Sequence, residues 1–213
     1  MDKAPDEKII LGIDPGTRIM GYGLIRARGQ QFSYIEMGVL NLTKTEDPLV
    51  RLEKIHEEVV RIIEAFSPDC LSIETPFYGK NVQSLIKLGR AQGVAIAAAM
   101  SKGVQVHEYA PLKIKQSLTG NGSASKEQVC AMVFRVLGMQ ADQPRFLDAT
   151  DAMAAAICHG IHCKFNALAA SGIKTSGSKA VGADTLRNSK KSSSKTKSSN
   201  WNAFLALHPE RVK

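Results

Sequence analysis

The stretch Ile9 to Ile25 (IILGIDPGTRIMGYGLI) constrains the fold more than any other part of the chain. It opens with an apolar run, Ile9 to Ile13, that is short enough to be a buried strand. Asp14 ends that run, a Pro-Gly pair favours a turn, and Met20 to Ile25 is typical of a second strand. A carboxylate at the exit of a buried strand lies where open α/β sheets bind ligands. Asp-Pro-Gly is also an ordinary turn sequence, so Asp14 alone fits a simple hairpin equally well.

The distribution of charge divides the chain into two parts. The net charge is +8, but it is unevenly distributed. Up to Lys164 the chain has 19 Lys and Arg residues and 18 Asp and Glu residues, whereas after Lys164 it has 9 Lys and Arg residues and 2 Asp and Glu residues. We predict one nearly neutral folded domain over residues 1–164, because a 44% hydrophobic fraction can supply a core. Residues 165–213 are predicted to be a disordered, basic, Ser/Lys-rich tail with a short apolar end segment. No segment resembles a membrane span or a signal peptide, which predicts a cytoplasmic protein that does not bind membranes.

The order of the next elements predicts a mixed α/β fold. A third strand over Gln31 to Leu42 would complete an antiparallel meander. An amphipathic helix from Pro48 to Phe66 then leads to a fourth strand, Cys70 to Ile73, which ends at Glu74. Strand, helix and strand in this order favour a right-handed parallel crossover. If the first and fourth strands are neighbours, about 4.8 Å apart, Asp14 and Glu74 emerge side by side.

The rest of the domain is predicted to hold one strand and four helices. Gly89 and Gly93 interrupt the first of these helices and favour close packing against a second subunit or a neighbouring helix. The predicted helices cover Asn81–Met100, Pro111–Leu118, Lys126–Leu137 and Asp148–His162, and the strand covers Val104–Tyr109.

The last predicted helix carries two further acids. Asp148 and Asp151 are spaced i,i+3 and therefore share one face. Helix capping and the helix dipole could account for both acids without any site. The many alanines of this helix, however, suit tight packing on a sheet. Such packing would bring the two acids to Asp14 and Glu74.

A zinc site is the alternative that the cysteines raise. Cys158 and His162, or His159 and Cys163, would share a helical face at i,i+4 spacing. No second ligand pair elsewhere completes a four-ligand site, so small buried thiols explain the cysteines better.

Four converging carboxylates predict metal chemistry. They would repel one another, and burial would raise some of their pKa values. Divalent cations relieve this repulsion, and oxygen ligands favour Mg²⁺ or Mn²⁺. Two such ions about 3.5–4 Å apart can promote in-line displacement at a phosphodiester. The residues therefore indicate metal-assisted phosphodiester hydrolysis.

Four segments in this order closely resemble the RuvC family of Holliday-junction resolvases. They are IILGIDPGT with the following GYGLI, then IETPFYGKN, EYAPLKIKQSLTGNGSASKEQV and LDATDAMAAAICH. The resemblance covers about Lys8 to His162 and implies a ribonuclease-H-like fold, with a five-stranded mixed sheet flanked by helices. It also implies a homodimer that makes paired, symmetric nicks in four-way junction DNA, in recombination and repair.

The same resemblance implies roles for single residues. Asp14 would bridge two Mg²⁺ ions per subunit, for which Mn²⁺ can substitute. Phe77 matches an aromatic residue that stacks on junction bases, although a core aromatic is the alternative. Lys115 and Lys126 match lysines near the DNA backbone, with solvated surface lysines as the alternative. The branch-migration complex RuvA–RuvB is the implied partner. The family's catalytic, metal-binding acids correspond to Asp14, Glu74, Asp148 and Asp151.

Three other functions compete with this interpretation. An actin-like or sugar-kinase-like ATPase also uses a strand-Asp-x-Gly-Thr turn, but that class needs a second domain and a second Gly-rich phosphate turn. A junction-binding protein without catalysis would not need all four acids. A related nuclease acting on RNA or on RNA–DNA hybrids stays open, because substrate competition alone separates it from a junction resolvase.

Overall fold

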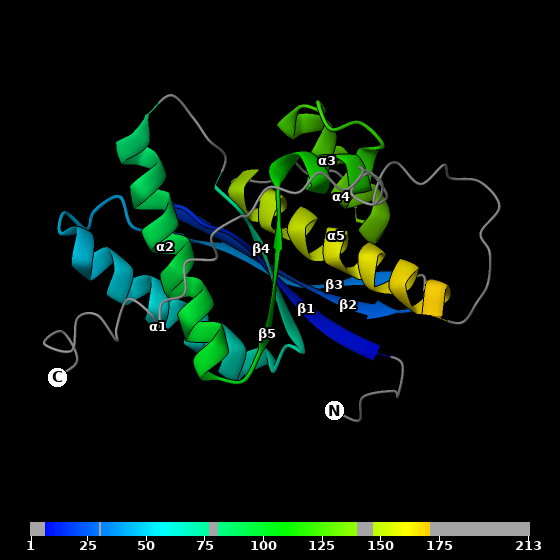
Figure 1. The fold of residues 1–213 in the computed structure, drawn as a ribbon, viewed down its shortest axis with the longest axis horizontal. Coiled ribbons are helices and arrows are strands. Elements are labelled where there is room, and N and C mark those ends of the chain that lie inside the picture. Colours follow the sequence, from blue (N-terminus) through cyan, green and yellow to red (C-terminus); the bar gives the residue numbers. More distant parts are fainter. Residues whose placement is uncertain (1–6, 30, 77–80, 140–146, 171–213) are drawn as a thin grey trace, which may run out of the picture. The chain divides into compact units, whose positions relative to one another are not determined.

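A five-stranded mixed sheet forms the centre of the protein (Figure 1). The computed structural model describes residues 7–29, 31–76, 81–139 and 147–170. The strands lie in the order β3-β2-β1-β4-β5, with the first three antiparallel and β4 and β5 parallel to β1. This confirms the predicted meander, the parallel crossover and the mixed sheet. The strands are β1 (Glu7–Asp14), β2 (Ile19–Arg28), β3 (Gln31–Asn41), β4 (Cys70–Glu74) and β5 (Gln105–Tyr109).

Helices cover both faces of the sheet. In Figure 1, α1 and α2 lie on one side, and α5 lies on the other side with α3 and α4 outside it. Each side has its own cluster of buried apolar residues. None of the helices within the described residues is long and apolar enough to cross a membrane. The helices are α1 (Pro48–Phe66), α2 (Val82–Ser101), α3 (Pro111–Thr119), α4 (Lys126–Leu137) and α5 (Leu147–Ala170).

The helix ends follow from local sequence signals. The side chain of Asp47 accepts hydrogen bonds from the first backbone N–H groups of α1, and Pro48 occupies a first-turn position that needs no N–H. Ser125 and Gln128 form a reciprocal capping box at the start of α4. Gly138 ends α4 with φ +63°, a left-handed conformation that glycine adopts without steric cost. These signals explain why the predicted boundaries of α1 and α4 agree with the structure.

The last helix extends further than the sequence predicted. We expected it to end at His162, whereas α5 continues to Ala170. Residues 165–170, which the sequence analysis assigned to the tail, are therefore helical. The run Ala167-Leu168-Ala169-Ala170 explains this, because Ala and Leu have the highest helix propensities. The remainder of the predicted tail, 171–213, lies outside the described residues.

Candidate active site

Three aspartates from two elements meet at one end of the sheet. Asp14 is the last residue of β1, whereas Asp148 and Asp151 lie on consecutive turns at the start of α5. One carboxylate oxygen from each of the three lies within 4.8 Å of the others. Among the described residues, this is the only group of three or more His, Cys, Asp or Glu side chains close enough to hold a metal ion.

Glycines on β1 and β2 allow α5 to come this close. A Cβ atom on Gly12 would lie 2.0 Å from the carbonyl oxygen of Ala152. A Cβ atom on Gly21 would lie 2.0 Å from the carbonyl oxygen of Asp148. Gly12 pairs with Gly23 across the two strands, and Gly23 lies directly against the backbone of Met153. The helix backbone therefore rests on the sheet backbone, which brings its acids to the end of β1.

A buried hydrogen bond fixes α5 on the neighbouring strand as well. Ser72 is fully buried in β4, and its hydroxyl donates to the carbonyl oxygen of Ala155 at 2.7 Å. A buried hydroxyl without a partner would be costly, so this bond favours one position of the helix along the sheet. The small side chains predicted for α5 do pack tightly on the sheet, since Ala152, Ala154 and Ala156 have no exposed surface.

Glu74 enters the site from the adjacent strand. Ile13 of β1 pairs with Ile73 of β4, so Asp14 and Glu74 follow at corresponding positions of parallel strands. Glu74 does not belong to the group of three aspartates. Its charge nevertheless reaches Asp14, and the charge of Asp151 reaches Glu74. The charges of the four predicted acids thus interact with one another, and Glu74 lies at the edge of the group.

Burial and mutual repulsion make two of these acids hard to ionise. Burial is the main reason that the pKa of Asp14 lies well above its usual range, and the charges of Glu74 and Asp151 add to the shift. Burial, followed by the charge of Asp151, raises the pKa of Glu74 to about 7. Such a site gains free energy by binding a cation, because a cation removes the repulsion that holds the protons in place.

Two lysines supply positive charge next to the acids. The Nζ atom of Lys126 lies 2.5 Å from Oδ2 of Asp151 and 4.0 Å from Oδ1 of Asp148. Partial burial works against the charge of Lys126, but its contact with Asp151 raises the pKa above the usual value overall. The positive charges of Lys126 and Lys115 both lower the pKa of Glu74 relative to burial alone. Both predicted lysines therefore lie within electrostatic reach of the acids.

Comparison with known proteins identifies the family. The family model described as "Crossover junction endodeoxyribonuclease RuvC" matches residues 10–159. A protein of that name from Bacteroides fragilis is 48% identical over 208 residues, which cover 97% of each chain. One from Cytophaga hutchinsonii is 57% identical over 153 residues, 72% of this chain and 76% of that protein.

The chain belongs to the RuvC family.

Solved structures agree with this family. The structure "T. thermophilus RuvC in complex with Holliday junction substrate" superposes with a TM-score of 0.70 at 31% identity, and the match covers 75% of this chain and 96% of that one. The predicted fold is thereby confirmed. All four predicted acids of this RuvC-family chain lie inside the matched segment, residues 10–159.

Two other predictions have different outcomes in this RuvC-family chain. Phe77 lies outside the described residues. The Cys158–Cys163 stretch, considered above for zinc, makes contacts within itself and with β5. His159 lies with Nε2 3.1 Å from Sγ of Cys163 and with Nδ1 2.8 Å from the hydroxyl of Tyr109. Both ring nitrogens already have partners, which fits the interpretation of these residues as packing groups.

The residues that hold the site together could not be recognised as such from the sequence pattern alone. Neither the glycine contacts nor Ser72 was predicted. A signal was present, because Gly21 and Gly23 are two residues apart on one strand and therefore share a face of the sheet. Glycines on one face of a sheet indicate close approach of another backbone. In this RuvC-family chain that backbone is the one that carries Asp148.

The raised pKa of Glu74 predicts how the metal-free protein responds to pH. A group whose pKa rises on folding adds stability at low pH, and that stability is lost as the pH rises from 4.5 to about 7. We expect Glu74→Gln to exceed the wild type by about 2–3 kcal/mol in unfolding free energy at pH 8, and to differ far less at pH 5. Urea denaturation in excess chelator measures this difference. Glu53→Gln, which removes an exposed carboxylate on α1, should have no effect at either pH. A stabilisation by Glu74→Gln that does not depend on pH would contradict the assigned pKa.

Proposed function

We propose that this protein resolves Holliday junctions by paired, symmetric nicks, with Asp14, Glu74, Asp148 and Asp151 as its catalytic acids. The observation that carries the proposal is the meeting of three aspartate carboxylates, from β1 and α5, within 4.8 Å. Membership of the crossover junction endodeoxyribonuclease family supports the activity. The Thermus thermophilus relative, whose structure is described as a complex with a Holliday junction substrate, supports the choice of DNA.

The donor set fits divalent metal ions, and we propose two Mg²⁺ per subunit. The acids offer only carboxylate oxygens, which favour hard cations such as Mg²⁺ and Mn²⁺. When bound, the two ions would supply activation of a water molecule and stabilisation of the leaving oxygen. Asp14 is the acid most affected by the others, since the charges of Glu74, Asp151 and Asp148 all raise its pKa. Asp14 would hold the metal together with Glu74, Asp148 and Asp151.

The two lysines would act on the DNA backbone. Lys115 and Lys126 carry positive charge to the edge of the acid group, where a phosphodiester must approach four carboxylates. Their charge offsets the repulsion between the acids and the phosphate. We propose that Phe77 stacks on junction bases. Stacking on an aromatic side chain suits this role because it tolerates any base sequence.

A cleavage assay tests the proposed function. Synthetic four-way junction, linear duplex and RNA–DNA hybrid are each incubated with the protein and Mg²⁺, and the products are mapped on every strand. We expect symmetric, ligatable nicks in the junction alone and none in excess chelator. Junction binding without cleavage would favour a binding protein, and preferred cleavage of the hybrid would favour the ribonuclease alternative.

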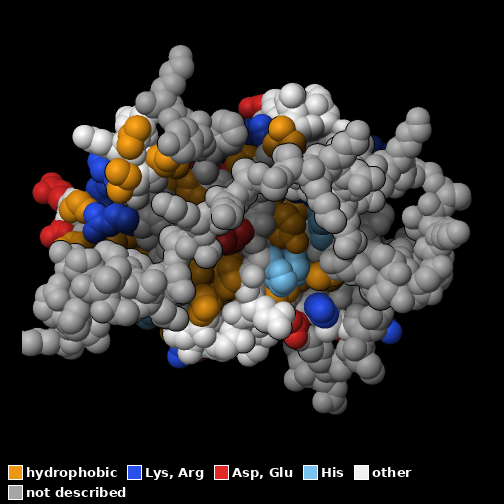
Figure 2. All heavy atoms as spheres, viewed as in Figure 1, with side chains coloured by type: hydrophobic (Ala, Val, Ile, Leu, Met, Phe, Trp, Pro, Cys, Tyr) orange, Lys and Arg blue, Asp and Glu red, His pale blue; other side chains and the backbone are white. Residues whose placement is uncertain are grey.

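We further propose that the protein is a homodimer that pairs through the outer face of α2. Val82, Ile86 and Met100 are 59%, 58% and 65% exposed, and they share one face of the helix with Gly89 and Gly93. Within the described residues, no atom lies within 4 Å of a Cβ built on either glycine. Figure 2 shows exposed hydrophobic side chains over α2. Large apolar residues at both ends with glycines between them suit close contact with a second helix, and two subunits would account for two nicks.

Substitution of Gly93 tests this dimer. We expect Gly93→Leu to weaken self-association about 10- to 100-fold, because overpacking a contact costs about 1–3 kcal/mol. Analytical ultracentrifugation over a range of protein concentrations measures this effect. Ala131→Leu, which introduces the same side chain at an exposed position of α4, is the control and should leave the dimer intact. A Gly93→Leu variant that dimerises as the wild type does would place the interface elsewhere.

A functional partner and a cellular location are also proposed. The RuvA–RuvB branch-migration complex is the proposed functional partner. A cytoplasmic location is proposed because bacterial junction DNA is found there.

A further inference from the structure

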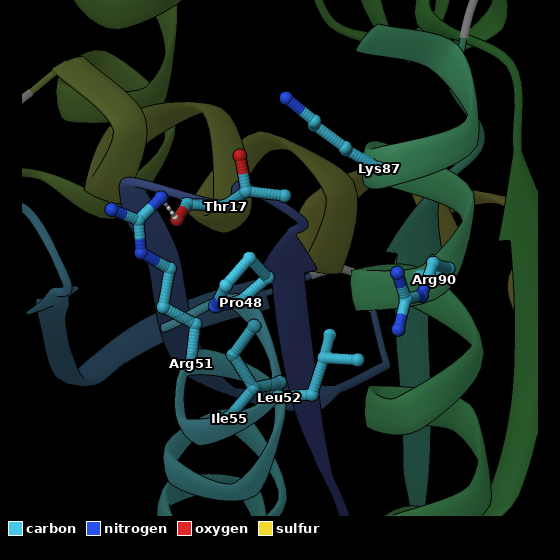
Figure 3. A pocket seen from close by; sticks show the side chains of 7 residues that line it. All are labelled: Thr17, Pro48, Arg51, Leu52, Ile55, Lys87 and Arg90. Carbon is cyan, nitrogen blue, oxygen red and sulfur yellow. Dashed lines mark hydrogen bonds between the residues drawn. The ribbon is translucent and has the colours of Figure 1, made fainter. Parts of the chain in front are cut away.

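A pocket lined by residues of α1 and α2 carries basic side chains that the proposed catalysis does not use. It lies between α1, α2 and the turn that follows β1 (Figure 3). Thr17, which lines it, comes three residues after Asp14 in the sequence. The empty volume is about 430 Å³ including the open solvent side. The lining residues are Thr17, Pro48, Arg51, Leu52, Ile55, Lys87 and Arg90.

The charge of this pocket is positive without compensation. Arg51, Lys87 and Arg90 line it, and no carboxylate from the described part of the chain does. The ion pairs found among the described residues include none of these three cations. Asp47, which directly precedes Pro48, already accepts two backbone N–H groups of α1. A pocket of this kind attracts an anion.

The parts of the pocket differ in rigidity. Arg51 is held in place, because its Nε donates to the carbonyl oxygen of Thr45 at 2.5 Å and its guanidinium also donates to that of Thr17 at 3.4 Å. Lys87 and Arg90 are exposed on α2, and Figure 3 shows Lys87 reaching toward Thr17. Pro48, Leu52 and Ile55 provide an apolar wall. The positive charges of Arg51, Lys87 and Arg90 and the hydroxyl of Thr17 suit a phosphate group. The apolar wall suits the sugar next to that phosphate.

We propose that this pocket binds a backbone phosphate of junction DNA other than the one that is cleaved. The inference rests on the proposed function, since it takes the strand that passes the acids as the ligand. Such a contact would hold the strand on the α1–α2 side of Asp14. Phosphate contacts of this kind position DNA without reading its sequence.

The test is the salt dependence of junction binding in excess chelator, where no cleavage takes place. Lys87→Gln and Arg90→Gln, alone and together, are compared with Lys44→Gln and Arg28→Gln, which remove the same charges from exposed positions outside the pocket. Each pocket substitution should flatten the slope of log K against log salt by about one, and the double variant should bind about 10-fold more weakly at 0.1 M salt. The two control variants should change the slope less.

The other outcomes overturn the inference in distinguishable ways. If pocket and control variants have equal slopes and the protein still cleaves junctions, the pocket does not bind a DNA phosphate, whereas the proposed function stands. Binding of inorganic phosphate or a free deoxynucleotide, seen in the amide spectrum of Thr17 without any change in junction affinity, would assign the pocket to a small anion. Loss of self-association in Arg90→Gln without a change in slope would assign it to the subunit interface. A wild type that neither binds nor cleaves junctions would refute the proposed function itself.

Discussion

Replacing Asp14 by Asn is expected to abolish junction cleavage while leaving junction binding intact or tighter. A carboxylate oxygen of Asp14 lies within 4.8 Å of one from each of the other two aspartates, and burial together with the charges of the neighbouring acids holds the pKa of Asp14 well above its usual range. Metal ions contribute several kcal/mol to such reactions, so a loss of about 10³-fold or more in rate is expected. Removing a negative charge near a phosphate also lowers the repulsion of DNA. Single-turnover cleavage and fluorescence anisotropy on the same junction measure the two effects.

The matched comparison for Asp14→Asn is Glu57→Gln, which removes an exposed carboxylate from α1. It should cleave at the wild-type rate. Calorimetric titration with Mg²⁺ provides a second readout, in which Asp14→Asn should bind far more weakly than Glu57→Gln. Cleavage by Asp14→Asn within tenfold of the wild type would remove Asp14 from the catalytic group.

Replacing Gly12 by Ala is expected to damage both stability and the acid group. The added methyl carbon would lie 2.0 Å from the carbonyl oxygen of Ala152 and 2.9 Å from the backbone nitrogen of Ala156. Backbone atoms cannot turn away as a side chain can, so α5 must move off the sheet. We expect a loss of at least about 3 kcal/mol in unfolding free energy. Because α5 carries Asp148 and Asp151, Mg²⁺ binding should weaken in the fraction that still folds.

The control for Gly12→Ala is Gly29→Ala. Gly29 has φ +52°, and no atom of the described residues lies within 4 Å of a Cβ built on it, so alanine there brings backbone strain without a clash. Its expected cost is about 1–2 kcal/mol, with unchanged Mg²⁺ binding. Urea denaturation and calorimetric titration of both variants separate strain from displacement of the helix. Equal stability losses with intact Mg²⁺ binding in both variants would mean that the sheet tolerates a shift of α5.

Much of this fold could be predicted because its local signals agree with its topology. The apolar run before Asp14 and the run before Glu74 are too short for helices, and the helix between them implies a parallel crossover. The structure pairs Ile13 with Ile73 in that arrangement. Strand ends and the i,i+3 spacing on the last helix singled out the four acids, and the resemblance of four ordered segments to one family then implied their catalytic role.

The unpredicted features depend on contacts between elements far apart in the sequence. Ser72 and Ala155 are 83 residues apart, and nothing local to Ser72 indicates its hydrogen bond. The contact of Lys126 with Asp151 is similar, because it requires the start of α4 to lie beside the start of α5. The sequence indicated a lysine near DNA, but only the packing of the helices shows that its ammonium group touches an acid.

The direct contact between α5 and the sheet limits how this enzyme can move. At Gly12, Gly21 and Gly23 the backbones of sheet and helix touch directly, with no side chain between them that could slide or repack. Interfaces that shear need such a layer, and hinges need a linker that bends. Sheet and helix should therefore move as one rigid body during a catalytic cycle. Any opening that admits a branched DNA substrate must therefore come from outside this unit of sheet and helix.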